Sequence, residues 1–257
     1  MSQILPPLNI EKLAPTRDRL QDVALVLSSL QRAFLPKDPR QWQYGLEVTM
    51  RGISTQAFML KGQETRAGID LVRRKFRLAS AAWRLDEYGG PELLNNVRVW
   101  LASQGVDNVL EEPKFKGIGQ DFVSDQAKVY AEALWWLHKQ FRIFKAELSE
   151  GVTSPILLYA HHFDLSLVWF PHDDERQLSL GWSTGDKTIP EPYLYFTAYP
   201  EPDGFSKLAV PKEAHWQTEG FSALILPYAA LAASEEPEKL LRQFAAGSFA
   251  ATQPLLG

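Results

Sequence analysis

The sequence predicts an α+β protein: mainly antiparallel sheet, as one sheet or two, flanked by helices. Two observations lead to this prediction. Short runs that alternate apolar and polar residues follow one another across turn residues, as in an antiparallel meander. Longer runs with helical spacing precede and follow these groups of strands, instead of alternating with single strands as in a doubly wound βαβ fold.

The first expected helix follows Pro15. Thr16 can cap its N-terminus, and Pro36 ends it. Its apolar residues recur at intervals of three and four positions: Leu20, Val23, Leu27, Leu30 and Phe34. This spacing predicts one apolar stripe that faces the core.

Strands are expected next. Residues 44–55 alternate as one strand, and residues 56–80 contain three more, with turns near Gly62 and Gly68. In the last of these strands three basic residues share a face: Arg73, Lys75 and Arg77. We interpret this segment as an edge strand whose charges oppose edge-to-edge pairing. Aromatic residues do not interleave with the charges, so a nucleic-acid surface is not expected.

Two further helices surround a connector. The second helix is expected to open at Pro91, a favoured first position, and to end at Gly105. Residues 106–123 contain turn residues and no clear period. Ser124 can cap the longest helix, which extends to about Leu148.

The longest helix carries a seam with alternating spacings of three and four residues. Its members are Ala127, Tyr130, Leu134, Leu137, Phe141, Phe144 and Leu148. A dimeric coiled coil would show this spacing, and so would a core helix that lies across a sheet. The seam is rich in aromatic residues and isolated, which favours the core helix.

The C-terminal part contains more strands and a last helix. The expected strands are residues 154–170, 176–184, 191–200 and 218–228. A helix begins near Pro237, after two acidic residues.

The order helix, strands, helix therefore occurs twice along the chain. We expect this division: an N-terminal extension (1–15), a first α+β unit (16–105), a connector (106–123) and a second α+β unit (124–257). Two arrangements agree with this order, a duplicated unit and two units that share one core.

Composition excludes several classes of function. The 257 residues include no cysteine, which removes disulfides and thiolate chemistry. The net charge of −4 and the sequence pI near 5.8 argue against general nucleic-acid affinity. No segment has the length of a membrane span or the pattern of a secretory signal, so we expect a soluble, cytoplasmic protein.

Several C-terminal motifs resemble an uncharacterised bacterial family known only as a domain of unknown function. The motifs are HHFDLSLVWF, GWSTGD, IPEPYLYFTAYPEP, HWQTEGF and LILPY. The resemblance extends over nearly the whole chain, and it implies a soluble cytoplasmic protein. It implies no activity, cofactor or functional residue.

The candidate catalytic residues are His162 and Asp164. If residues 161–170 form one strand, these two side chains share a face about 7 Å apart. That spacing suits two ligands of one metal, or an acid and a base on either side of a small substrate. The alternative is a strand whose outer face is simply solvated. Short metal-ligand motifs such as HExxH are absent, so no metal site and no particular cofactor are predicted.

Tyrosines of the next strands extend this candidate site. Tyr193 and Tyr195 share a face and could adjoin the His162 face as aromatic walls for a ligand. The candidate ligand-binding residues are Glu191, Tyr193, Tyr195, His215, Glu219 and Trp182. The same tyrosine stripe could instead pack under a helix.

Residues 181–185 match the G-x-S-x-G nucleophile elbow, but the proline-rich segment that follows cannot form the helix that an elbow requires.

Two functions of different class follow from these patterns. The first is a small-molecule-binding protein or enzyme with a His/Asp/Tyr pocket on the C-terminal sheet. The alternative is a non-catalytic interaction protein, a homodimer formed through the aromatic strands or through the seam of the longest helix. Neither function involves a membrane or a nucleic acid.

Overall fold

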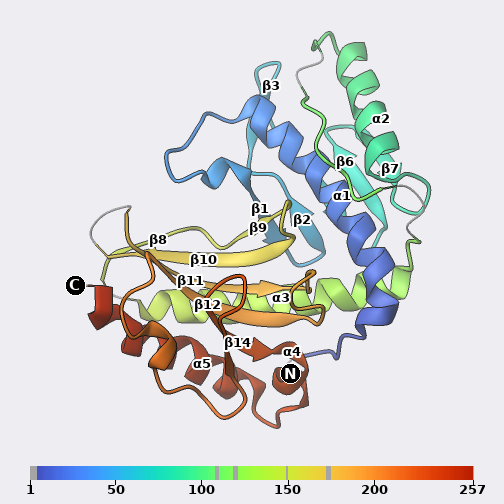
Figure 1. Cartoon of the computed structure of the whole chain (residues 1–257). Coiled ribbons are helices and arrows are strands. Elements are labelled where there is room, and N and C mark those ends of the chain that lie inside the picture. Colours follow the sequence, from blue (N-terminus) through green and yellow to red (C-terminus); the bar gives the residue numbers. More distant parts are fainter. Residues whose placement is uncertain (1–4, 108–109, 118–120, 149, 172–174, 257) are drawn as a thin grey trace. The chain divides into compact units, whose positions relative to one another are not determined.

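A computed structural model describes residues 5–107, 110–117, 121–148, 150–171 and 175–256 (Figure 1). The chain forms two compact units, which are interleaved along the sequence. Unit 1 comprises residues 1–10, 136–156 and 164–257, and unit 2 comprises residues 11–135 and 157–163. Both units contain helices and strands, and neighbouring strands of the described residues pair antiparallel within each unit. The predicted α+β class is therefore confirmed.

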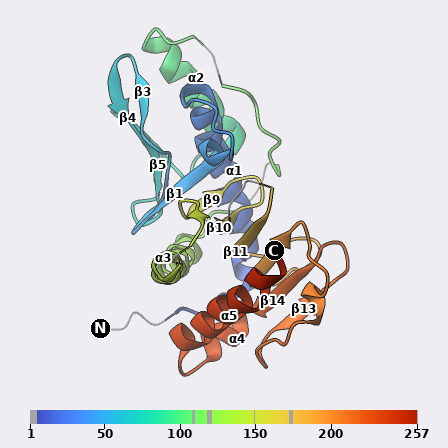
Figure 2. The same cartoon turned by 90° about the vertical axis from the view of Figure 1, so that its left-hand side faces the viewer.

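Unit 2 contains one sheet and one separate hairpin. Its elements are α1 (Ile10–Phe34), a 3₁₀-helix (Trp42–Tyr44), β1 (Gly45–Thr49), β2 (Gly52–Ser54), β3 (Phe58–Leu60), β4 (Gln63–Thr65), β5 (Ala67–Asp70), β6 (Lys75–Leu78), β7 (Ala81–Arg84), α2 (Gly90–Ser103) and β9 (Leu157–Tyr159). The sheet has the order β9-β1-β2-β5-β6-β7, and β3 pairs with β4. Figure 2 shows α1 and α2 on one side of the strands of this unit.

Helix α1 begins before its predicted cap. Thr16 is fully buried inside the helix, where its hydroxyl accepts the N–H of Val123 at 3.0 Å. Pro15 also lies within the helix. Leu13 is 1% exposed, so the apolar stripe continues N-terminal to the proline. Burial of this extra turn explains why the helix starts earlier than the capping signal indicated.

The single strand predicted for residues 44–55 is a hairpin instead. Thr49 pairs with Gly52, and the chain turns between them. Met50 continues the apolar alternation of Leu46 and Val48 in the sequence, but it lies in this turn and is 66% exposed. Gly52 has a φ of +154° and sits against the backbone of Ile69, so the tight return depends on glycine.

Of the other predictions for these strands, one turn is confirmed, whereas the second turn and the edge strand are wrong. Gly62 forms the β3–β4 turn with a φ of +79°, as predicted. Gly68 was predicted in a turn but lies inside β5, paired with Ser54 and Arg77. Strand β6 was predicted at the edge but lies between β5 and β7. Arg73 belongs to the turn before β6 rather than to the strand.

Unit 1 is built around a second run of antiparallel strands. Its elements are β8 (Val152–Thr153), β10 (Asp164–Phe170), β11 (Gln177–Ser183), β12 (Tyr193–Tyr199), a 3₁₀-helix (Phe205–Lys207), β13 (His215–Gln217), β14 (Ala223–Pro227), α4 (Tyr228–Ala233), α5 (Pro237–Thr252) and a 3₁₀-helix (Gln253–Leu256). The strand order is β13-β14-β12-β11-β10, and β8 pairs with β10. Leu5 is buried, and Tyr228 donates a hydrogen bond to the carbonyl of Pro6 at 2.6 Å.

Helix α3 (Ser124–Glu147) contributes residues to both units. The core interpretation of its seam is confirmed, because these members are at most 4% exposed: Ala127, Tyr130, Leu134, Leu137, Phe141 and Phe144. A seam buried in a single chain is not available to a coiled-coil partner.

One histidine on α3 should make stability depend on pH. Burial, and then the charge of Arg142, lower the pKa of His138 to about 4. In the unfolded chain the histidine pKa is about 6.5, so between these values only the unfolded state binds the proton. Stability should therefore fall as the pH drops from about 6.5 to about 4. Because the ring is only partly buried, we expect a loss of about 1–2 kcal/mol.

Urea unfolding near neutral pH and at acidic pH checks this expectation. His138→Gln should remove that part of the acid-induced loss. His215→Gln, at an exposed histidine of unit 1, is the matched control. This variant should lose stability at acidic pH as the wild type does. If His138→Gln shows the same acid sensitivity as the wild type, the ring does not exclude the proton.

Candidate polar site on the unit 1 sheet

Strands β10, β11 and β12 carry a polar face at one end of each strand, where β10 and β12 begin and β11 ends. Side chains alternate between the faces of a strand, so residues paired across strands share a face. Two cross-strand rows form this polar face: Asp164, Ser183 and Tyr193 in one, and Ser166, Gly181 and Tyr195 in the other. The opposite face is apolar, with Leu165, Leu180 and Phe196 no more than 2% exposed.

The ring of Tyr195 crosses Gly181 and reaches a carboxylate two strands away. Its hydroxyl donates to Asp164 Oδ2 at 2.5 Å. A Cβ at position 181 would overlap the Tyr195 ring and hydroxyl, so the ring occupies the space that glycine leaves empty. The position of the Tyr195 ring on the polar face therefore requires glycine at position 181.

Tyr193 is held by the loop between β11 and β12. Its hydroxyl donates to Asp186 Oδ2 at 2.7 Å. The other oxygen, Asp186 Oδ1, accepts the N–H groups of Thr188 and Ile189 at 2.6 and 2.9 Å. One carboxylate therefore fixes both the loop and the tyrosine ring.

Both phenols are hydrogen-bond donors at neutral pH. Burial, the charge of Asp164 and the hydrogen bond to it hold the pKa of Tyr195 well above its usual value. Burial and then the hydrogen bond to Asp186 likewise raise the pKa of Tyr193. Because a carboxylate beside a phenol disfavours the phenolate, neither tyrosine can act as a base near neutral pH.

An apolar cluster closes one end of the polar face. Tyr193, Ala223 and Ile225 are its buried members, and Ile189, Tyr195 and Phe221 pack against them. Asp164 and Tyr195 are only half-buried. The side chains of Asp164 and Tyr195 are therefore partly open to solvent, although Asp164 Oδ1 itself is buried.

Comparison with known families gives one match. A family described as "Family of unknown function (DUF5996)" matches residues 96–256. The chain belongs to this family. Neither the search of curated proteins nor the search of solved structures gave a match. The match confirms the expected resemblance to a domain of unknown function, although it starts at residue 96 rather than covering nearly the whole chain.

The matched part of this DUF5996 chain includes each strand of unit 1 and hence the whole polar face. Among the residues that the structure describes, no group of three or more His, Asp or Glu side chains could hold a metal ion. The helices within the described residues include none with the length and hydropathy of a membrane span.

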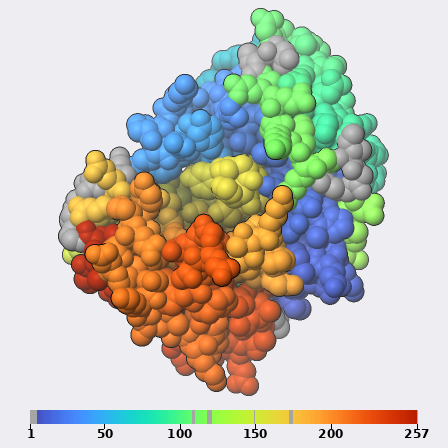
Figure 3. Space-filling view, viewed as in Figure 1, coloured from blue at the N-terminus to red at the C-terminus, as the bar shows by residue number. Residues whose placement is uncertain are grey.

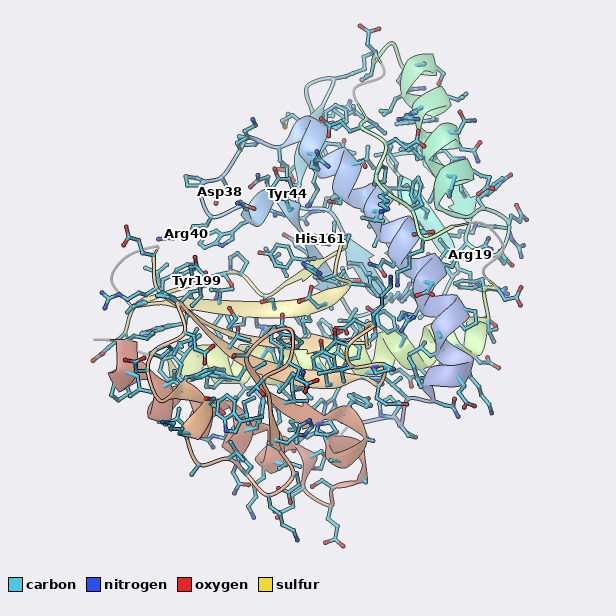
Figure 4. The ribbon with its side chains drawn as sticks, in the orientation of Figure 1. Arg19, Asp38, Arg40, Tyr44, His161 and Tyr199 are labelled. Atoms are coloured by element: carbon cyan, nitrogen blue, oxygen red, sulfur yellow. The ribbon has the colours of Figure 1, made fainter. Side chains whose placement is uncertain are left out.

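His162 of the DUF5996 chain does not lie on the strand predicted for it. Strand β10 begins at Asp164, and His162 is exposed in the turn that follows β9. Phe163 has a φ of +56° and stacks on Tyr130 with ring centroids 5.4 Å apart. This turn interrupts the alternation that was predicted to place His162 and Asp164 on one face. His161, labelled in Figure 4, is in the same turn and is also exposed.

The remaining candidates lie at different places on unit 1. Trp182 is fully buried and belongs to the apolar face, next to Tyr228. His215 pairs with Ile225, which pairs with Tyr195, so the exposed His215 shares the face and the row of Tyr195 from two strands away. Two carboxylates, Glu191 and Glu219, are exposed in loops before β12 and before β14. The loops that join these last strands, orange in Figure 3, lie at the surface of the molecule.

Sequence reasoning missed three residues of the site in this DUF5996 protein: Ser166, Gly181 and Asp186. Gly181 faces Tyr195 across the strands, and a glycine inside a strand pattern often marks a close approach. A glycine within the strand pattern could therefore have identified Gly181 from the sequence. Asp186 holds Tyr193 through loop geometry, for which the sequence offers only a general preference of Asp for turns.

Proposed function

We propose that the polar face binds a small polar molecule that carries hydroxyl or amino groups. Tyr195 supplies an apolar ring with a polar tip, and Asp164 holds that tip in place through its Oδ2 atom. The observation that carries the proposal is the half-buried Asp164–Tyr195 pair, bonded at 2.5 Å over Gly181. In such a pair the phenolic oxygen of Tyr195 is a hydrogen-bond acceptor held in one position beside an apolar ring.

The rigidity of the surroundings supports binding. Asp186 holds the loop and Tyr193 in one geometry, and the apolar cluster packs against Tyr195. A site whose groups are already positioned loses little conformational entropy when a ligand arrives. Because the raised pKa of Tyr195 makes it a poor base, the proposal is for binding, and it assigns no catalytic role to His162.

Fluorine NMR of protein labelled with fluorotyrosine tests the proposal. The chain has eight tyrosines, and Tyr195→Phe and Tyr199→Phe assign two of the signals. We expect glucose or glucosamine to shift the Tyr195 signal saturably. In Tyr195→Phe, binding is followed by the signal of the neighbouring Tyr193, whose ring lies 6.3 Å away. It should weaken about tenfold, because the change removes a hydrogen bond linked to a carboxylate.

Tyr199 supplies the matched control. It lies on the same strand and face, at the far end of β12 (Figure 4), and is 66% exposed. Tyr199→Phe should change neither the binding nor the Tyr195 signal. The proposal is wrong if neither sugar shifts the Tyr195 signal, or if both variants weaken binding equally.

A further inference from the structure

Unit 2 has a second candidate site, independent of the polar face. It lies on the side of the sheet opposite the packed side chains of Ile53, Ile69 and Phe76, which are at most 2% exposed. Helices α1 and α2 lie on one side of these strands (Figure 2). Ser54, Gly68 and Arg77 pair across β2, β5 and β6, so they form a row on the outer face.

A hollow of about 500 Å³ lies over this row. Ser54 and Gly68 have little or no side chain, so the strand surface is low at these positions. Longer side chains surround it: Arg51, Arg66 and Asp70 belong to the lining together with Arg77. The volume is in the range of small-molecule sites.

The charge of the hollow is positive. Three guanidinium groups and one carboxylate line it. Asp70 lies 3.8 Å from Arg51, and Arg66 pairs with Glu47. Arg77 is exposed and forms no ion pair within the described part of the chain. A cation without a partner beside a hollow can bind an anion without breaking an existing pair.

We propose that this hollow binds a small molecule with an oxyanion group, a phosphate ester or a carboxylic acid. Arg77 is the principal contact, because a guanidinium group binds two oxygens of a phosphate or carboxylate through parallel N–H donors. Ser54 adds a hydroxyl at the floor of the hollow. No aromatic side chain lines the hollow, so the stacking that single-stranded nucleic acids need is missing.

Arginine Nε–Hε spectra of the isotope-labelled full chain test this proposal. Inorganic phosphate and succinate are titrated separately at constant ionic strength, so the two arms distinguish a phosphate site from a carboxylate site. We expect one of them to shift the Arg77 signal saturably. In Arg77→Gln, binding is followed by the signals of Arg51 and Arg66, which also line the hollow, and it should weaken about tenfold or more.

Two further variants separate occupancy of the hollow from general electrostatic attraction. Arg73→Gln removes the same charge from the exposed turn before β6. Arg73 does not line the hollow, but it lies 4.0 Å from Asp70, which does. Because Asp70 keeps Arg51 as a partner, this variant should change affinity less than about twofold. Ser54→Leu leaves the charge unchanged but fills the floor, and it should abolish binding.

Several outcomes would overturn the proposal. Equal effects of Arg77→Gln and Arg73→Gln would show attraction to the general charge of the unit. Unchanged binding in Ser54→Leu would show that the anion does not enter the hollow. A failure of both anions to shift the Arg77 signal, or tighter binding of a short DNA duplex that depends equally on Arg73 and Arg77, would also contradict it.

Discussion

Phe141→Ala should destabilise the protein by about 3–5 kcal/mol, the range for removing a buried aromatic ring. Phe141 is fully buried on α3, so the substitution removes apolar contacts and leaves a cavity. Urea unfolding followed by circular dichroism measures the loss, provided that the transition is cooperative.

Ile143→Ala is the matched control on the same helix. Ile143 is 54% exposed, and the change should alter the free energy of unfolding by no more than about 0.5 kcal/mol. The pair also distinguishes the two functions considered from the sequence. If the seam formed a dimer interface, Phe141→Ala would yield a stable folded monomer, and the loss of stability would depend on protein concentration.

The sequence predicted the long helices well because their patterns are local. The repeat of three and four positions over α3 requires no knowledge of its partners. The start of α1 and the hairpin of β1 and β2 were missed for tertiary reasons. Leu13 extends α1 only because the fold buries it, and the turn after Thr49 is closed by the fit of Gly52 against Ile69.

The sequence likewise predicted only part of the candidate site. Alternation with period two placed Tyr193 and Tyr195 on one face, and the structure places both there together with Asp164. The position of His162 could not be deduced, because the turn that moves it depends on the stacking of Phe163 on Tyr130. That contact joins residues far apart in the sequence, which strand periodicity does not report.

Gly181→Ala is the second substitution for which we expect a large effect. In a strand this change normally stabilises a protein slightly, since alanine loses less backbone entropy on folding. Here the new methyl group would overlap the Tyr195 ring. The ring must move away, and its hydrogen bond to Asp164 is lost. We expect a destabilisation of about 1–3 kcal/mol, as for overpacked cores.

A double-mutant cycle with Tyr195→Ala shows whether this contact is the cause. With the ring removed, the alanine at position 181 has room, so Gly181→Ala should become neutral or slightly stabilising. The coupling between the two changes should then be about 1–3 kcal/mol. Gly247→Ala is the control, because a Cβ there meets no atom within 4 Å, and it should not couple to Tyr195→Ala. Additive effects at positions 181 and 195 would mean that the ring does not lie over Gly181. In that case Asp164 would lose the donor that fixes it, and the proposed binding site would lose its main support.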